Sequence, residues 1–209
     1  MALKNFNEII HLVKQFPVRK KCGVVAADEH SIEAAIEAEK EGLADPIFIG
    51  NKEEISRILQ KMGALKSYPI VESTDAADAA EKGVALAREG EVDFLLKGHI
   101  DTSVLLRAVV NKDKGLGTGR LMTHFVFNEI PTYHKLLVTT DGGMVTYPDV
   151  EGKQKIIENT VEVLHKLGYE NPKIACLAAI EKLNPKMPET VDAEELKRRN
   201  QQGIITGCI

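Results

Sequence analysis

Polar residues gather directly after an apolar run of this sequence, where they could bind an anion. Lys97, Gly98 and His99 follow the run VDFLL, and Asp101 and Thr102 come next. In open α/β sheets, ligands bind beyond the carboxyl ends of the strands, where helix amino termini present free N–H groups. Lysine supplies positive charge there, and glycine lets the backbone approach a ligand closely. The alternative is a plain helix start, in which Asp101 or Thr102 only caps the following helix.

A second candidate for anion binding is the glycine-rich segment NKDKGLGTGR at 111–120. The backbone amides around Gly117 and Gly119 could wrap a phosphate, and the Arg120 guanidinium could clamp it with two hydrogen bonds. The segment lacks the GK[ST] ending of a P-loop and the spacing of GxGxxG. A mobile, solvated turn is therefore the alternative interpretation.

The motifs of several other active sites are missing from the sequence. Its six histidines form no HExxH motif and no tight pair with cysteine, so the sequence predicts no metal site. His99 and His124 could hydrogen-bond a phosphate or a carbonyl, although a lone histidine is more often structural. There is no GxSxG elbow for a nucleophilic serine. Cys22 and Cys176 lie in apolar runs, which predicts buried core positions rather than nucleophiles.

The elements that must position these residues alternate along the chain. Short apolar runs and helix-period segments follow each other from Cys22 onward, as in a mostly parallel sheet with helices on its faces. Helix starts are predicted at Asp28, at Asn51 with Glu54 three residues on, and near Asp75. Right-handed crossovers then predict a doubly wound sheet. Its four strands are expected at 22–27, 46–50, 68–72 and 92–98.

The alternation of predicted strands and helices ends after the glycine-rich segment. Two strand-like runs, 121–130 and 135–143, are separated by only a few residues. We therefore place a domain boundary here and predict a first α/β domain at 1–129 and part of a second at 130–209.

The second domain is expected to contain two more apolar strands and two helices. A helix is predicted from Ile156 to Gly168, a buried strand at 172–180, and a short charged helix capped by Asp192. The last segment, GIITGCI at 203–209, has the pattern of a core strand. A sheet that ended there would lack its remaining layer, so we expect the second domain to be incomplete. The alternative is a terminal strand inserted into a finished sheet.

Composition and charge exclude several classes of protein. The 209 residues include 27 Lys+Arg and 31 Asp+Glu, for a formal net charge of -4, so no broad cationic surface for nucleic acid or anionic membrane is implied. No apolar stretch approaches the roughly 20 residues needed to cross a bilayer, and the amino terminus lacks the apolar centre of a signal peptide. Three widely spaced cysteines do not form a disulfide framework. These features predict a cytoplasmic protein.

Six stretches of the sequence resemble the phosphate acyltransferase family, which comprises phosphate acetyltransferases and phosphate butyryltransferases. They follow the family order over nearly the whole chain, and the last of them is more similar to the butyryl branch. The stretches are AADE at 26–29, DPIFIGN at 45–51, the block 95–120, THFVF at 123–127, TDGGMVTYPD at 140–149 and NPKMPETVDAEEL at 184–196.

The resemblance implies a two-domain α/β fold like that of isocitrate and isopropylmalate dehydrogenases, with the active site between the domains. It implies reversible transfer of a butyryl or acetyl group between coenzyme A and inorganic phosphate, through an acyl phosphate. Coenzyme A and phosphate would be substrates, and no metal or tightly bound cofactor would be needed. A homodimer or higher oligomer is also implied, with neither nucleic acid nor membrane as a partner.

The resemblance also assigns roles to individual residues. Apart from these roles, a hydrophobic acyl chain would need an apolar pocket, for which Met187 and Val191 are candidates. Arg120 matches the family arginine that holds the phosphoryl group, with Lys97 and His99 as the other catalytic candidates. The implied substrate-binding residues are Gly98, Thr102, Gly117, Gly119, Thr123, His124, Asp141, Gly142, Asn184 and Lys186.

One departure from the family leaves alternatives open. Family members continue beyond GCI to the serine, arginine and aspartate assigned to activation of the coenzyme A thiol, and this sequence contains only the phosphate side of the site. The chain could therefore be an acyl phosphate-binding module without activity alone. A hydroxy-acid dehydrogenase of the same fold group is another alternative. It would need carboxylates for a divalent metal, and Asp141 is available but no DxxxD pattern occurs.

Overall fold

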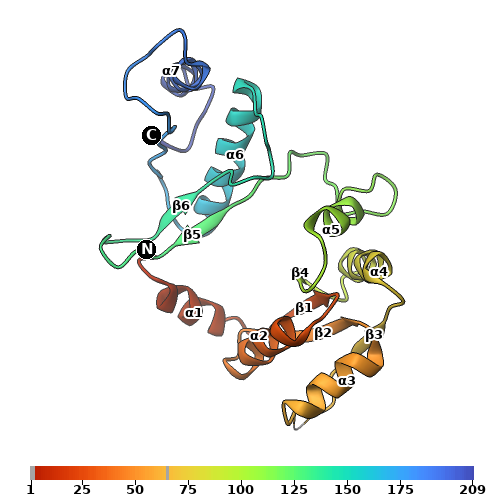
Figure 1. Ribbon diagram of the computed structural model, residues 1–209. Coiled ribbons are helices and arrows are strands. Elements are labelled where there is room, and N and C mark those ends of the chain that lie inside the picture. The colour runs from red at the N-terminus through yellow and green to blue at the C-terminus, as the bar shows by residue number, and fades with distance from the viewer. Residues whose placement is uncertain (1–2, 65) are drawn as a thin grey trace. The chain divides into compact units, whose positions relative to one another are not determined.

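The computed structural model describes residues 3–64 and 66–209, which divide into two compact units. One unit is Ile10–Gly119, and the other combines Met1–Ile9 with Arg120–Ile209. This division lies within the glycine-rich segment, between Gly119 and Arg120, whereas the predicted boundary lies farther along, at 129/130. Figure 1 shows the elements of each unit along the chain.

The Ile10–Gly119 unit is built on a parallel four-stranded sheet. Its strand order is β3-β2-β1-β4, and each neighbouring pair is parallel. This order confirms the predicted doubly wound arrangement, in which the chain moves outward from β1 in both directions. The strands are β1 (Lys20–Val25), β2 (Ala44–Gly50), β3 (Ile70–Glu72) and β4 (Phe94–Lys97).

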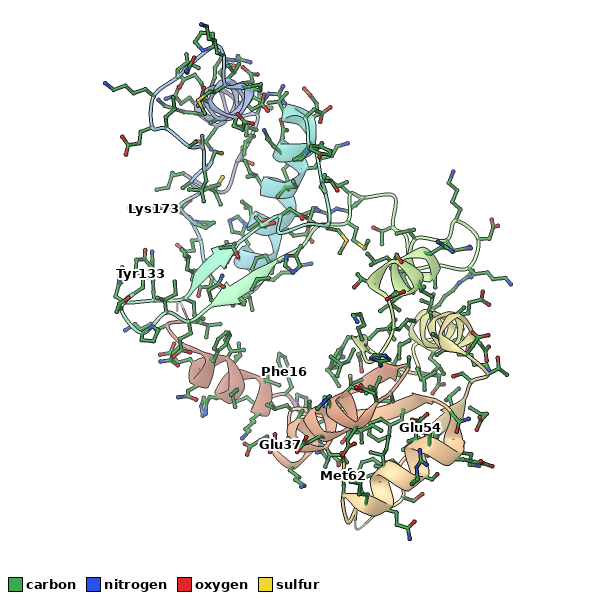
Figure 2. All side chains as sticks on the ribbon, viewed as in Figure 1. Phe16, Glu37, Glu54, Met62, Tyr133 and Lys173 are labelled. Carbon is green, nitrogen blue, oxygen red and sulfur yellow. The ribbon has the colours of Figure 1, made fainter. Side chains whose placement is uncertain are left out.

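Helices cover both faces of this sheet because successive strand residues point in opposite directions. Val24 and Phe48 are fully buried in the cluster that α2 and α3 complete, whereas Val25 and Ile49 belong to the cluster of α4 and α5. The charged faces of α2 and α3 are solvent-exposed, as Glu54 illustrates (Figure 2). The helices are α2 (Glu29–Lys40), α3 (Lys52–Lys61), α4 (Ala76–Arg88) and α5 (Thr102–Val109).

Side-chain caps explain where the first helices of this unit begin. The Asp28 carboxylate accepts from the Ser31 backbone N–H, and the Ser31 hydroxyl oxygen accepts from the Asp28 N–H at 2.9 Å, which completes a capping box. Asn51 Oδ1 accepts from the Glu54 N–H at 2.9 Å. These predicted caps are thus confirmed, as is the one at Asp75, whose side chain accepts from the Asp78 N–H. Asp101 precedes α5 but makes no side-chain capping bond.

Asp28, which caps its helix, and Asp101, which does not, give a matched test of capping. We expect Asp28→Ala to lower the free energy of unfolding by about 1 kcal/mol, because a helix donor loses its acceptor. Asp101→Ala should change it by less than about 0.5 kcal/mol, since no capping bond is lost. Urea unfolding followed by circular dichroism measures both, and equal losses would contradict the capping argument.

The other unit contains an antiparallel hairpin and the helices α6 (Val150–Lys166) and α7 (Pro188–Gln201). Strands β5 (Val126–Asn128) and β6 (Leu137–Thr139) form the hairpin. Helix α1 (Phe6–Lys14) begins where the Phe6 N–H donates to Glu129 Oε2 at 2.7 Å. The core shares residues from α6, α7 and the end of the chain: Ile157, Val161, Leu196, Ile205 and Cys208.

The hairpin is the antiparallel exception to the predicted mostly parallel sheets. Phe127 pairs with Val138 in an antiparallel ladder. The reason is the short connection between the strands, because a parallel pair requires a crossover of a dozen or more residues. The two predicted runs are also longer than the strands that form, since only three residues of each are paired.

The predicted buried strand at 172–180 is wrong. The segment is irregular, with Cys176 exposed and the Leu177 side chain 88% exposed. Its Ile174 N–H donates to the Ile209 carbonyl at 2.8 Å. An apolar run predicts burial, but a strand also needs a partner with a continuous row of backbone groups. Cys22, in contrast, is buried as predicted.

The last segment, 203–209, is not the core strand that its composition predicts. Gly203 and Gly207 adopt positive φ angles of 71° and 78°, which turn the backbone twice within a few residues. Ile205 and Cys208 nevertheless reach the core. Hydrophobic residues are therefore buried here by turns rather than by strand pairing.

Helix α7 begins earlier than the predicted cap at Asp192. Met187 is the N-cap and Pro188 the first helical residue, a position that suits proline because its missing N–H would be unpaired there anyway. Asp192 lies inside the helix and pairs with Lys153 of α6 at 2.6 Å. This ion pair joins α6 and α7.

Candidate functional site

Gly98 lies where the end of β4 meets the end of β1. Its N–H donates to the Val25 carbonyl at 2.8 Å, and the His99 N–H donates to the Ala26 carbonyl at 2.9 Å. A Cβ atom on Gly98 would lie 2.3 Å from the Ala26 carbonyl oxygen. Glycine is required here because two backbones of the protein approach each other closely.

Lys97 and its neighbours line the carboxyl edge of the parallel sheet. The Lys97 ammonium donates to the carbonyl oxygens of Ile100, at 2.6 Å, and Gly98, at 3.3 Å. These contacts hold the charge over the turn and leave one of its three N–H donors free. Among the described residues, the exposed side chains of His99 and Thr102 have no hydrogen-bond partner. The edge therefore presents one cation and two polar groups to solvent.

The first half of the glycine-rich segment is a fixed turn. Asn111 Oδ1 accepts from the N–H groups of Asp113, at 3.0 Å, and Lys114, at 2.9 Å. A Cβ on Gly115 would lie 2.4 Å from the carbonyl oxygens of Asn111 and Val109. Residues 111–115 therefore form a hydrogen-bonded turn, with residues 111–114 exposed to solvent.

The second half of the segment has an open backbone. A Cβ on Gly117 would meet no described atom within 4 Å, and Gly119 has a positive φ of 79°. Backbone N–H groups in such a stretch are accessible to an anion. Arg120 follows directly and begins the other unit.

Arg120 is anchored to helix α6. Its Nη1 donates to Glu162 Oε2 at 2.5 Å, and its Nη2 donates to Asn159 Oδ1 at 2.7 Å. The ammonium of Lys166 and the guanidinium of Arg120 lower the pKa of Glu162 to about 2. The Arg120 side chain remains 54% exposed. An ionised, anchored guanidinium therefore faces solvent.

Asp141 organises the loop that follows β6. Its Oδ2 accepts from the His124 N–H at 2.7 Å, and its Oδ1 accepts from the N–H groups of Gly143, at 2.8 Å, and Met144, at 2.6 Å. Burial raises the pKa of Asp141, but these N–H donors outweigh it and hold the pKa below its ordinary 3.8. A Cβ on Gly142 would lie 2.7 Å from His124 Nδ1. The structure thus brings Asp141, Gly142 and His124 together, as one loop cluster.

The Asp141 carboxylate predicts a pH-dependent contribution to stability. Because its folded pKa is lowered, the contribution is complete above about pH 4 and is lost as the pH falls through the folded pKa. We expect Asp141→Asn to lower the free energy of unfolding by about 1–2 kcal/mol at neutral pH, and the difference from the parent to shrink in acid. Urea titrations at several pH values measure it. Asp113→Asn is the control, and a difference independent of pH would contradict the assignment.

Asn184 and Lys186 lie in the turn before α7. Asn184 Oδ1 accepts from the Lys186 N–H at 3.0 Å, and the buried Thr190 hydroxyl donates to the Asn184 carbonyl at 2.9 Å. The Lys186 side chain is exposed. The turn thus uses the Asn184 side chain structurally and leaves the lysine free to meet an anion.

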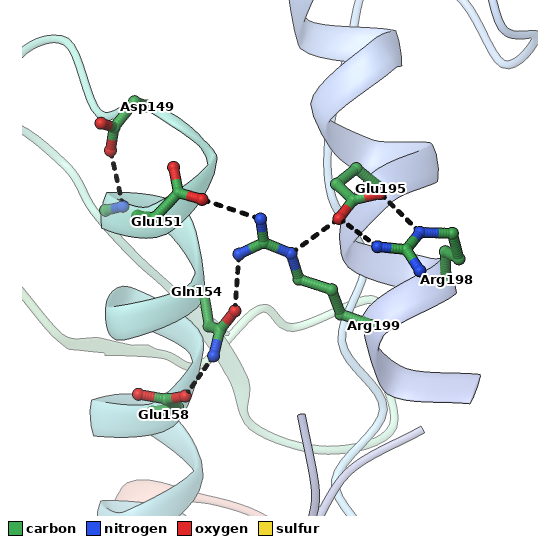
Figure 3. Close-up of polar contacts among 8 residues, drawn as sticks. Asp149, Glu151, Gln154, Glu158, Glu195, Arg198 and Arg199 are labelled. Carbon is green, nitrogen blue, oxygen red and sulfur yellow. Dashed lines mark hydrogen bonds and ion pairs between the residues drawn. The ribbon is translucent and has the colours of Figure 1, made fainter. Parts of the chain in front are cut away.

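Polar contacts fix α7 against α6 (Figure 3). Arg199 of α7 donates to Glu151 Oε1 and Gln154 Oε1, both on α6 and both at 2.8 Å. It also donates to Glu195 Oε1 on its own helix, at 2.8 Å. The position of the turn before α7 therefore depends on the amino-terminal part of α6.

Sequence reasoning missed Asn159, Glu162 and Thr190, which support the predicted site residues. Asn159 carried one usable signal, because asparagine is a weak helix former and its place inside a helix calls for another role. The predicted residues themselves divide between the units: Lys97 to Gly119 belong to Ile10–Gly119, whereas Arg120 to Lys186 belong to the other.

The described residues contain neither a cluster of metal-ligating side chains nor a helix that could span a membrane. No group of three or more His, Cys, Asp or Glu side chains is arranged to hold a metal ion within residues 3–64 and 66–209. None of the helices described has both the length and the apolar character needed to span a membrane.

The parallel sheet with helices on both faces defines an α/β protein. The Lys97 ammonium in one unit and the Arg120 guanidinium in the other are each held by hydrogen bonds and exposed to solvent. The family model described as phosphate acetyl/butaryl transferase matches residues 67–207. The chain belongs to this family of acyltransferases, which confirms the resemblance found in the sequence.

Named relatives support the same membership. A phosphate butyryltransferase of Clostridium acetobutylicum is 41% identical over 208 residues, which are 99% of this chain and 69% of that protein. A phosphate acetyltransferase of Thermotoga maritima is 39% identical over 191 residues, or 91% of this chain and 65% of that protein. Each alignment thus covers nearly all of this chain but only about two thirds of the relative.

Solved structures have the same fold. A branched-chain phosphotransacylase from Enterococcus faecalis matches with a TM-score of 0.72 and 29% identity, over 86% of this chain and 63% of that one. A phosphotransacetylase from Streptococcus pyogenes matches with a TM-score of 0.73 over 98% of this chain and 72% of that one. At 19% identity, the second match supports the fold alone.

Proposed function

We propose that this chain binds inorganic phosphate for the reversible transfer of a short acyl group between coenzyme A and phosphate. The observation that carries the proposal is the half-exposed Arg120 guanidinium, anchored on α6 directly after the open backbone of Gly117–Gly119. Arginine suits this role because its fork of donors matches phosphate oxygens. The family membership supports the acyl-transfer chemistry.

Acyl transfer from a thioester to phosphate requires mainly positively charged side chains and hydrogen-bond donors in the site. A phosphate oxygen attacks the thioester carbonyl, the new O–C bond forms, and the C–S bond breaks as coenzyme A leaves as a thiolate that takes up a proton. In the tetrahedral intermediate between these two steps, negative charge is concentrated on the phosphate and on the former carbonyl oxygen. Cations and N–H donors therefore stabilise this intermediate. Arg120 and Lys97 are the proposed cations, and His99 is a proposed hydrogen-bond donor.

We propose the remaining site residues in the roles that the resemblance implies. Met187 and Val191 lie four residues apart around the start of α7, and their partly exposed side chains are candidates for the acyl pocket. Relatives named for butyryl and for acetyl transfer both match this chain, so either acyl group is a candidate substrate. The other proposed substrate-binding residues are Gly98, Thr102, Gly117, Gly119, Thr123, His124, Asp141, Gly142, Asn184 and Lys186.

Three further parts of the proposal follow the family. Coenzyme A and phosphate are substrates, and we propose no tightly bound cofactor because phosphate itself is the nucleophile. The dehydrogenase-like two-domain fold, a homo-oligomeric assembly and a cytoplasmic location stay predictions. The dehydrogenase activity that the sequence left open is not favoured, since the named relatives are phosphate acyltransferases.

Release of coenzyme A tests the proposed function. The chain is incubated with butyryl-CoA or acetyl-CoA, with and without inorganic phosphate, and free thiol is measured. Release that depends on phosphate supports the transferase. Phosphate binding in calorimetry without release would instead favour the acyl phosphate-binding module. If the chain neither binds phosphate nor releases coenzyme A, the proposed function is contradicted.

A further inference from the structure

We propose that Asn159 and Glu162 of α6 are positioning residues that orient the Arg120 guanidinium for phosphate. This inference rests on the proposed function, because it gives a supporting shell to the arginine assigned to phosphate. The two residues lie three apart on one helix and therefore on one face of it. Each contacts a different nitrogen of the guanidinium.

Two acceptors on different nitrogens fix both the position and the plane of a guanidinium. Glu162 Oε2 accepts from Nη1 at 2.5 Å, and Asn159 Oδ1 accepts from Nη2 at 2.7 Å. A guanidinium has five N–H donors, so donors remain on the free side for a phosphate. An arginine held in one orientation loses less conformational freedom on binding than a free one.

Asn159 also fixes the chain from which Arg120 projects. Its Nδ2 donates to the Leu121 carbonyl at 2.8 Å and to Thr123 Oγ1 at 3.3 Å. These acceptors determine which end of the amide is the nitrogen, so the amide oxygen faces Arg120. One side chain thus positions the guanidinium and the backbone that follows it.

The charges around Glu162 favour an anion despite the carboxylate. Glu162 Oε2 contacts Arg120, and its Oε1 accepts from Lys166 at 2.7 Å. Two cations therefore share one carboxylate, and the group keeps one net positive charge. Phosphate meets an oriented and still positive site.

The opposite interpretation makes a different prediction. If Glu162 competed with phosphate for Arg120, removing the carboxylate would free the guanidinium and tighten phosphate binding. If Glu162 positions Arg120, removing it weakens phosphate binding. A glutamine at this position separates the two, because its amide oxygen still accepts from Arg120 but carries no charge.

Calorimetric titration of the whole chain with inorganic phosphate tests the inference. We expect Asn159→Ala and Glu162→Ala to weaken binding about tenfold each, the scale of one lost hydrogen bond to a charged group. Glu162→Gln should remain within about threefold of the parent, because it restores the acceptor. Glu158→Ala is the matched control, since Glu158 lies on the same helix and its side chain contacts Gln154 rather than Arg120.

Each outcome decides the inference. Unfolding temperatures measured on every variant show whether the fold is retained, and a merely structural role would not give recovery of phosphate affinity in Glu162→Gln. Parent-like or tighter binding by Glu162→Ala overturns the inference and leaves the proposed function standing. A parent chain that binds no phosphate overturns the proposed function, and the inference with it.

Discussion

Replacing Arg120 by alanine is expected to weaken binding of inorganic phosphate by about 2–3 kcal/mol, roughly 30- to 150-fold. The variant removes the guanidinium that α6 holds half-exposed and that follows the open glycines directly in the sequence. Charge-assisted hydrogen bonds to phosphate are among the strongest that a side chain makes. Calorimetry with inorganic phosphate measures the loss, and circular dichroism checks that the fold is retained.

Lys112→Ala is the control for the loss of a nearby positive charge. Lys112 is exposed in the glycine-rich segment, and its side chain makes no hydrogen bond or ion pair to a described residue. We expect a smaller weakening of phosphate binding that disappears as salt is added, because exposed charges are screened. Unchanged phosphate affinity in Arg120→Ala would remove Arg120 from the site. An equal loss in Lys112→Ala would place that lysine inside it.

Gly98→Ala is expected to cost about 3 kcal/mol of folding stability, at the upper end of the range for overpacking. The added methyl would lie 2.3 Å from the Ala26 carbonyl oxygen and 2.9 Å from the Val25 carbonyl oxygen. Both oxygens accept backbone hydrogen bonds, from Gly98 and His99, directly after the paired strands β1 and β4, so neither can move aside cheaply. Urea unfolding gives the free energy.

Gly117→Ala separates this effect from the general cost of replacing glycine. No described atom lies within 4 Å of the Cβ position at Gly117. We expect its free energy of unfolding to change by less than about 0.5 kcal/mol, as for a surface substitution. If Gly98→Ala were equally mild, the end of β4 would have to be looser than its contacts indicate.

Local signals in the sequence were sufficient for the parallel sheet. The alternating apolar residues of β1 and β2 divide between two helix layers, and the caps at Asp28 and Asn51 fix the helix starts. The segment 172–180 shows where such signals fail. Its residues are apolar, but whether they pair depends on which backbone lies beside them, and that is a property of the whole fold.

The sequence predicted which residues are candidates for the site, but not which residues contact them. Arg120 stood out because a cation follows a glycine-rich stretch, and Gly98 because a glycine follows a strand. Their partners come from distant parts of the chain, as Glu162 does for Arg120 and Ala26 for Gly98. A single sequence carries no signal for contacts between such separated positions. Asp141 is an example: the sequence shows a carboxylate, but only the structure shows that it accepts hydrogen bonds from the N–H groups of its own loop.

Helix α6 contacts two arginines at different points along its length. Glu151 and Gln154 near its start hold Arg199 of α7, whereas Asn159 and Glu162 near its end hold Arg120. An α-helix turns by about 100° per residue, so one residue inserted between Gln154 and Asn159 would rotate one pair away from its arginine while the other stayed in place. The length of α6 between these pairs is therefore constrained along with its buried residues Ile156 and Ile157, because an insertion or deletion there would separate one arginine from its acceptors.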